Sequence, residues 1–120
     1  RNSYVDITSP LNITEVHYVQ RNGIEATVSL TYNGRHASAT DTGNGRLDAV
    51  SNAIRSYTGL DFSINTYTEH ALEEGSASKA VSYVEIISAG KSFWGTGIDN
   101  DIITSSIKAL VSAVNNMISA

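Results

Sequence analysis

An alternating stretch that ends in a tight-turn dipeptide is the feature that most constrains how this chain can fold. In residues 25–32, EATVSLTY, apolar and polar side chains alternate, and Asn33-Gly34 follows directly. A period of two is typical of a strand with one buried face, and Asn-Gly favours a two-residue hairpin turn because both residues tolerate a positive φ. We therefore predict antiparallel strands over residues 25–32 and 35–40.

The period changes after this hairpin. Leu47, Val50, Ile54 and Tyr57 follow at spacings of three, four and three, which places them on one face of a helix. Gly59 then supplies a stop signal. With a further short strand at 16–20 and a turn at 21–23, the first half is predicted to contain three strands and a helix.

The second half of the chain repeats this order. Strands are predicted over residues 62–70, 80–87 and 91–97, with a loop at 73–78 and a turn at 88–90. A helix follows from about residue 101, and its apolar side chains again recur at helical spacing. They are Ile103, Ile107, Leu110, Val114 and Met117.

When Gly34 is placed on Gly90, the two halves of the sequence align, and Val28 then meets Val84. Three strands and one helix cannot bury both faces of a sheet, so each half needs its twin or a second chain. We predict an α+β domain of two βββα units related by a pseudo-twofold, with antiparallel sheets and helices packed on them. Its units are residues 11–59 and 60–120, after a linker remnant over residues 1–10.

Composition narrows the classes of function. The 120 residues carry a net charge of −4 and no cysteine, and the isoelectric point lies near 5.2. An acidic chain lacks the basic surface that nucleic acids or anionic membranes require, so neither is expected as a partner. The absence of cysteine fits a cytoplasmic protein. No apolar run approaches the roughly 20 residues needed to cross a bilayer.

The motif GNG, residues 43–45, precedes the first helix but lacks the lysine of a phosphate loop and the third glycine of a dinucleotide fingerprint. We interpret it as a helix start capped by Asn44 or a neighbour, which can also hold an anion. The motif DND, residues 99–101, is either a helix cap or a metal site, and we favour the cap. The histidines show no zinc spacing. No catalytic set is complete, so the residues alone indicate a dimerising or ligand-binding domain.

Three segments, taken together and in this order, carry a resemblance to a known family. They are GNGRLDAVSNAI from residue 43, YTEHALEEGSASKAVSYVEI from residue 67 and WGTGIDNDIITSSIKALVSAVNN from residue 94. From about Leu11 to the end, the chain resembles the C-terminal regulatory domain of the 2-isopropylmalate synthases, whose close relatives are the citramalate synthases.

The resemblance implies a domain that dimerises, binds leucine near the dimer interface and inhibits the first committed step of leucine biosynthesis. Catalysis would belong to a (β/α)₈ barrel of the same full-length chain, which joins acetyl-CoA to 2-ketoisovalerate with a divalent metal. Such a barrel takes about 250 residues and does not fit in this chain. We therefore expect no catalytic residue, no metal site and no cofactor in this domain.

Carried over position by position, the resemblance also implies a leucine pocket. Its expected residues are Asn44, Gly45, Leu47, Asp48, Ile64, Tyr67, Ala71, Ser78, Ala80, Asn100, Asp101 and Ile102. Free amides at both helix starts would hold the carboxylate, and Asp48, Asp99 or Asp101 the ammonium. Small and aliphatic side chains would enclose the isobutyl group. Two alternatives stay open: isoleucine as the effector of a citramalate synthase, and a dimerisation module without a ligand.

Overall fold

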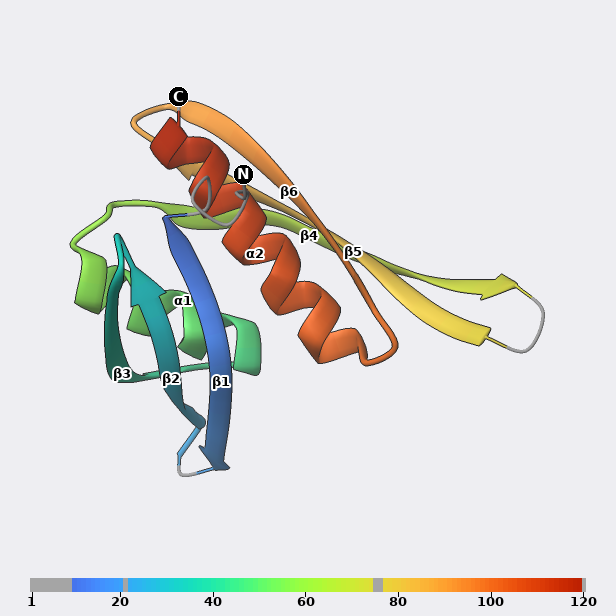
Figure 1. Ribbon diagram of the computed structural model, residues 1–120, viewed down its shortest axis with the longest axis horizontal. Coiled ribbons are helices and arrows are strands. Elements are labelled where there is room, and N and C mark those ends of the chain that lie inside the picture. The colour runs from blue at the N-terminus through green and yellow to red at the C-terminus, as the bar shows by residue number, and fades with distance from the viewer. Residues whose placement is uncertain (1–9, 21, 75–76, 120) are drawn as a thin grey trace.

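A computed structural model describes residues 10–20, 22–74 and 77–119. For residues 72–74 and 77–78 it describes the backbone alone. The first unit consists of β1 (Leu11–Gln20), β2 (Ile24–Tyr32), β3 (Arg35–Gly43) and α1 (Arg46–Thr58). The second consists of β4 (Ser63–Glu74), β5 (Ala77–Ser88), β6 (Lys91–Asp99) and α2 (Ile102–Ser119). Each set of strands forms an antiparallel sheet in chain order (Figure 1). The predicted α+β fold of two βββα units is confirmed.

The predicted correspondence between the halves recurs in the element bounds. With Gly34 placed on Gly90, β3 and β6 begin and end at matching positions, and α1 and α2 begin at matching positions. Both hairpins turn through two residues of positive φ, with Asn33 at 52° and Gly34 at 84° in the first, and Ala89 at 52° and Gly90 at 79° in the second. This left-handed backbone is what a type I′ turn requires. Both sheets also carry a bulge where the first strand meets equivalent residues of the second.

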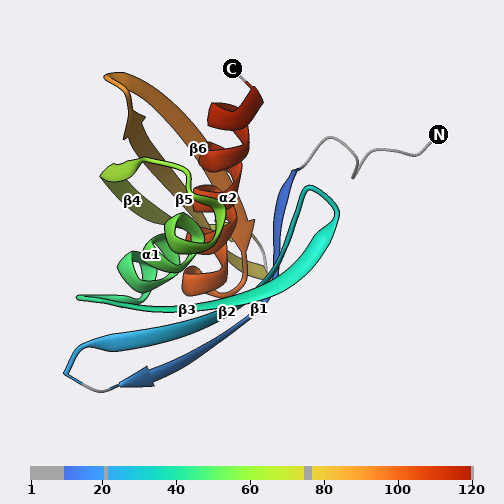
Figure 2. The same ribbon diagram turned by 90° about the vertical axis from the view of Figure 1, so that its left-hand side faces the viewer.

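One hydrophobic core joins the two units. Each helix covers the inner face of its own sheet, and α2 also approaches β1 (Figures 1 and 2). The alternation of β2 explains the first half of this core, because Ala26, Val28 and Leu30 are all buried against α1. Val84, Ile86, Leu110 and other buried side chains of the second unit belong to the same cluster.

Each helix also makes hydrogen bonds to the opposite unit, at or just before the first strand of that unit. Asn115 on α2 accepts a hydrogen bond from the Leu11 backbone N–H and donates one to the Leu11 carbonyl oxygen, each at 2.9 Å. Arg55 on α1 donates to the carbonyl oxygen of Phe62, just before β4, at 3.0 Å. These reciprocal ties fix the arrangement of the two units and leave a cavity where they meet.

Two glycines allow α2 to lie very close to β6. A Cβ atom added at Gly95 would come within 2.1 Å of the Ala109 carbonyl oxygen, and one at Gly97 within 2.2 Å of the Ser105 carbonyl oxygen. No side chain tolerates such distances, so the WGTG stretch of β6 is a contact surface for the helix backbone.

The strands are longer than predicted, and four strand ends lie well outside the predicted ranges. β1 begins at Leu11 rather than at residue 16, β3 continues to Gly43, and β4 and β5 occupy most of the predicted loop at 73–78. Ladder pairing extends into residues without strand-like side chains, because the hairpin partner supplies the hydrogen bonds. Residues beyond the Ala80 pair project as a two-stranded arm (Figure 1). Of the predicted linker remnant, residues 1–9 lie outside the described part of the chain.

Candidate ligand-binding site

A cavity of about 360 Å³ opens where the two units meet. It is lined from β1, the start of α1, β4 and the first turns of α2. The lining residues are Tyr18, Gly45, Arg46, Leu47, Asp48, Ile64, Tyr67, Ile103, Ser106 and Ile107. Its volume falls in the range of small-ligand pockets, and aliphatic walls with a few polar groups are the usual composition of such pockets.

The start of α1 contributes backbone amides to this cavity. Gly45 is the N-cap residue in an extended conformation, and no side chain caps the helix. The predicted helix start is confirmed, and the predicted side-chain cap by Asn44 or a neighbour is wrong. The first amides of an α-helix have no partner within the helix, and they carry the positive end of its dipole. An added Cβ at Gly45 would meet no atom within 4 Å, so the space next to these amides is open.

The start of α2 is different, although it occupies the equivalent place in the second unit. The Asp101 carboxylate accepts hydrogen bonds from the Thr104 backbone N–H at 3.0 Å and the Thr104 hydroxyl at 2.7 Å. These hydrogen bonds hold the pKa of Asp101 below its ordinary value. The predicted capping role of the DND motif is confirmed, and the expectation of free amides at both helix starts holds only for α1.

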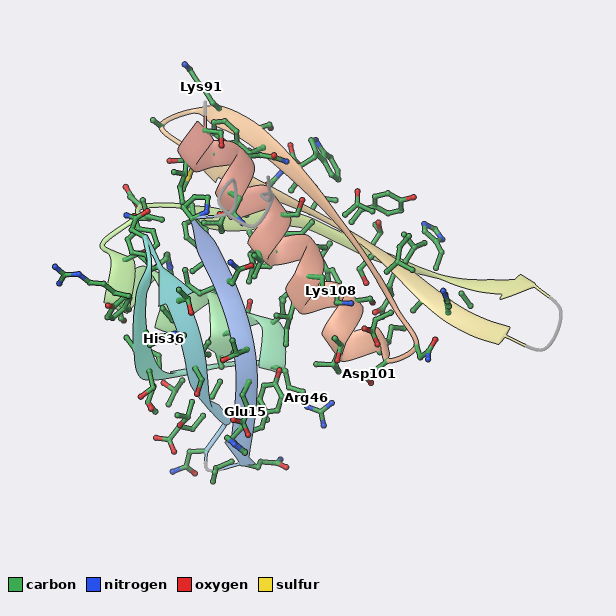
Figure 3. All side chains as sticks on the ribbon, in the orientation of Figure 1. Glu15, His36, Arg46, Lys91, Asp101 and Lys108 are labelled. Carbon is green, nitrogen blue, oxygen red and sulfur yellow. The ribbon has the colours of Figure 1, made fainter. Side chains whose placement is uncertain are left out.

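Tyr18 places a polar group without a hydrogen-bond partner at the cavity. Its hydroxyl is buried and has no hydrogen-bond partner. Burial raises its pKa, against the nearby positive charge of Arg46, whose guanidinium carbon lies 5.6 Å from the ring centroid. A buried hydroxyl without a partner is costly, so a ligand that bonds it gains affinity. Figure 3 shows Arg46 at the start of α1 and Asp101 at the start of α2, the two charges that act on Tyr18.

Tyr67 borders the cavity from β4 and begins a chain of hydroxyl groups. Its hydroxyl donates to Glu69 at 2.6 Å and lies 2.6 Å from the Ser106 hydroxyl. Burial, and next the Glu69 carboxylate, raise the pKa of Tyr67. Ser106 and Ser105 in turn bond Ser82 on β5, at 3.2 and 2.7 Å. This buried network holds the first turn of α2 against the second sheet and fixes one wall of the cavity.

Of the three acidic residues considered for an ammonium group, Asp48 is the one that lines the cavity. Asp99 pairs with Lys108 at 2.8 Å and accepts the Asp101 backbone N–H at 3.1 Å. The Lys108 hydrogen bond lowers the pKa of Asp99. Asp101 is engaged as the cap of α2. The arrangement therefore leaves the exposed carboxylate of Asp48 at the cavity for an incoming cation.

The structure distributes the twelve predicted residues over three places. Gly45, Leu47, Asp48, Ile64 and Tyr67 line the cavity. Asn44 lines an adjoining depression of about 430 Å³ that shares Asp48 and Ile64 with it.

The other six belong to the projecting arm or to the start of α2 and do not line the cavity. Ala71 pairs with Ala80, and Ala80 with Asp99, so these residues form a row beside Asn100, Asp101 and Ile102. Ser78 pairs with Glu73 through the backbone, and its side chain lies outside the described part.

Sequence reasoning missed five lining residues, Tyr18, Arg46, Ile103, Ser106 and Ile107. Tyr18 stood in a strand with no motif, and its approach to α1 follows only from the packing of the units. Ile103 and Ile107 were identified as core positions of a helix, and a helix edge that faces a neighbouring unit gives no separate signal.

Other features of the surface give weaker candidates. A groove of about 480 Å³ between β1 and α2 contains none of the predicted residues. Across the described residues, no three His, Asp or Glu side chains form a group able to hold a metal ion. None of the described helices is long and apolar enough to cross a membrane.

Comparison with known proteins agrees with this arrangement. Residues 7–118 match the family model of the LeuA allosteric (dimerisation) domain. The 2-isopropylmalate synthase of Desulfitobacterium hafniense is 46% identical over 116 residues, which is 96% of this chain and 21% of that protein. That of Helicobacter hepaticus is 42% identical over 130 residues, 98% of this chain and 23% of that protein. That of Clostridium acetobutylicum is 39% identical, over 96% of this chain and 22% of that protein.

This chain thus spans about a fifth of the length of the relatives it matches. The two βββα units, the cavity between them and the match over nearly all residues lead to one assignment: the chain belongs to the LeuA allosteric (dimerisation) domain family, the regulatory domain of 2-isopropylmalate synthase.

Proposed function

We propose that this chain binds leucine in the cavity between its two units and, as a homodimer, relays feedback inhibition to a catalytic barrel elsewhere in the full-length synthase. The observation that carries the proposal is the uncapped start of α1, which presents free amides to an open space beside Gly45. A carboxylate is the natural ligand for such a helix start.

The rest of the cavity suits the other parts of an amino acid. Leu47, Ile64 and Ile103 supply aliphatic surface for a branched side chain. The Asp48 carboxylate can accept hydrogen bonds from the ammonium group. The Tyr18 hydroxyl, buried without a partner, can bond either oxygen of the ligand carboxylate.

In this scheme the condensation of acetyl-CoA with 2-ketoisovalerate, and its divalent metal, belong to the part of the synthase outside this chain. Leucine then acts through a coupling free energy between two distant sites. The ligand lies between the two units, so a change in their relative position is the simplest route by which binding could reach the barrel.

Isoleucine, the effector expected for a citramalate synthase, is the second candidate. It differs from leucine by the position of one methyl group, and discrimination at that level is worth about 1–3 kcal/mol. The relatives described above are all named 2-isopropylmalate synthase, which favours leucine.

The test is the melting temperature of this chain with leucine, isoleucine or valine. A ligand at 100 times its Kd stabilises by about 2.7 kcal/mol, which raises the Tm of a domain of this size by roughly 10 °C. A shift with isoleucine alone would transfer the proposal to the second candidate. No shift with any of the three would contradict ligand binding.

Gly45→Asp tests the place of the ligand. Aspartate is a preferred N-cap residue, so its carboxylate would occupy the amides that the ligand carboxylate needs. The space beside Gly45 is open, so the variant should fold and lose the leucine-dependent rise in Tm. Gly45→Ala is the control, since it adds a methyl group without an acceptor and should keep most of the rise. If leucine stabilises Gly45→Asp fully, the carboxylate site lies elsewhere.

A further inference from the structure

We propose that Tyr18 sets the upper size limit of the ligand, because its side chain separates the cavity between the units from a second cavity beside it. This inference rests on the proposed function and deepens it by naming a residue that selects a small branched amino acid over an aromatic one.

The second cavity has a volume of about 300 Å³ and lies between β1 and the first turns of α2. Figure 3 labels three residues that line it, Glu15 on β1, Asp101 just before α2 and Lys108 on α2. The other lining residues are Ile13, Thr14, Val16, Tyr18, Ile103, Thr104 and Ile107.

Three residues line both cavities, and Tyr18 is the one that can separate them. Ile103 and Ile107 lie one turn apart on α2, so they form a wall that continues from one cavity into the other. Tyr18 comes from β1, and it is the one described residue of that strand that lines the cavity between the units. Its hydroxyl feels the charges of Arg46, which lines that cavity, and of Asp101, which lines the second. The Tyr18 side chain therefore stands between the two.

The charged side chains of the second cavity are already engaged within the protein. Asp101 caps α2 through its hydrogen bonds with the following turn. Lys108 pairs with Asp99 at 2.8 Å, and Glu15 lies 2.7 Å from His17. What this cavity offers to an incoming group is therefore its aliphatic surface.

The internal repeat shows why the second cavity is not a second amino-acid site. With Gly34 placed on Gly90, Gly45 corresponds to Asp101 and Leu47 to Ile103, so the second cavity is the counterpart of the first. Its helix start is occupied by the Asp101 carboxylate, whereas that of α1 is open. A ligand held at α1 would use the second cavity only for the end of a longer side chain.

The Tyr18 ring blocks that extension. A ligand bound at the α1 amides has room for a branched aliphatic side chain beside Leu47 and Ile103. A phenyl ring is larger and would meet the Tyr18 ring, and a close-packed wall does not accept extra carbon atoms without cost. Removing the Tyr18 ring should join cavities of about 360 and 300 Å³ and expose Val16 to the ligand.

The test is the Kd of leucine and of phenylalanine, measured by isothermal titration calorimetry on the wild type and on Tyr18→Val. Valine removes the ring and is itself favoured in strands. Wild type should prefer leucine by about 100-fold or more, since a single misfitting methylene is worth roughly 10- to 200-fold. Tyr18→Val should bind phenylalanine at least about tenfold more tightly than wild type does, and its preference for leucine should fall below about tenfold.

Two control variants separate the ring from its hydroxyl and from cavity volume. Tyr18→Phe keeps the ring, so it should weaken leucine binding by about tenfold at most, as for one lost hydrogen bond, and still reject phenylalanine. Val16→Ala enlarges the second cavity from a residue that does not line the first, so the wild-type preference should remain. Equal gains in phenylalanine binding for Val16→Ala and Tyr18→Val would contradict a partition at Tyr18.

The remaining outcomes distinguish this inference from the proposed function. A Tyr18→Val protein that is folded by circular dichroism and rejects phenylalanine as strongly as wild type would overturn the inference and leave leucine binding intact. So would a wild type that binds phenylalanine as tightly as leucine, a result that needs no variant. If Tyr18→Val does not fold, Tyr18→Leu takes its place, because leucine fills more of the space left by the ring. A wild type that binds neither amino acid would overturn the proposed function itself.

Discussion

The two βββα units of this chain can be compared position by position, because β3 and β6, and the starts of α1 and α2, coincide when Gly34 is placed on Gly90. Position 45 and position 101 are equivalent starts of a helix. Gly45 leaves the amides of α1 open beside a cavity, whereas the Asp101 carboxylate occupies those of α2. Both helices form, so folding of this unit does not depend on whether a side chain caps the helix. The uncapped amides of α1 are therefore available for a ligand.

A second pair of equivalent positions explains how closely each helix can approach its sheet. Asp41 on β3 accepts a hydrogen bond at 2.6 Å from Ser56 on α1. Its counterpart on β6 is Gly97, where the backbone of α2 replaces any side chain. At this pair of positions the first unit holds its helix by a polar contact, and the second by direct packing of backbone on backbone. The first unit also packs closely at Gly43, where an added Cβ would lie 2.6 Å from the backbone N of Ala49 on α1.

Gly97→Val should have the largest effect of the changes that test this comparison. The added Cβ would clash with the Ser105 carbonyl oxygen at 2.2 Å, so α2 must move away from β6 and the core beneath it must open. We expect a loss of at least about 3 kcal/mol in the free energy of unfolding, measured by urea denaturation. Thr96→Val, on the opposite face of the same strand, is the control and should change stability little. A Gly97→Val protein as stable as the wild type would show that the close packing is not required.

The sequence predicts the fold well because its signals are local and repeated. Alternation over residues 25–32, the Asn33-Gly34 turn and the apolar stripes of both helices each follow from backbone geometry alone. The second half of the chain repeats the same strand and helix signals, so each half supports the prediction for the other. Strand ends were missed, at Leu11 and in the arm, because pairing with a partner strand extends structure past the residues that favour it.

The site is less visible in the sequence, since it forms between units rather than within one. The resemblance supplies residues such as Gly45 and Tyr67, which the structure brings to one cavity. Tyr18 comes from a strand with no motif, and only packing brings its hydroxyl to the cavity. The sequence also did not decide between a cap and a metal site at the start of α2, because the DND motif at residues 99–101 suits either.

Asp101→Ala sharpens the comparison of the helix starts with an effect of intermediate size. It leaves the Thr104 N–H and hydroxyl without their acceptor, so α2 should fray at its first turn. We expect the Tm to fall by about 4 °C, as for the loss of a good N-cap. Asp101→Asn keeps an acceptor and should retain most of the stability. Equal Tm values for Asp101→Ala and wild type would mean that the cap is not what holds this helix start.

Asp41→Asn should have the smallest effect, and its signature is a dependence on pH. The hydrogen bond from Ser56, and next that from the Thr42 N–H, hold the pKa of Asp41 below its ordinary value of 3.8. A carboxyl with a lowered pKa stabilises the fold above its ordinary pKa, and this stabilisation is lost as the pH falls through the lowered value. The side chain is mostly in water, so the contribution at pH 7 is less than about 0.5 kcal/mol.

Wild type should therefore be slightly more stable than Asp41→Asn at pH 7, and thermal melts should show the difference narrowing from about pH 5 to pH 3. Ser56→Ala removes the larger of the two donors and should give the same narrowing, whereas a difference that widens toward low pH would mean that the charged form of Asp41 does not hold α1 to β3.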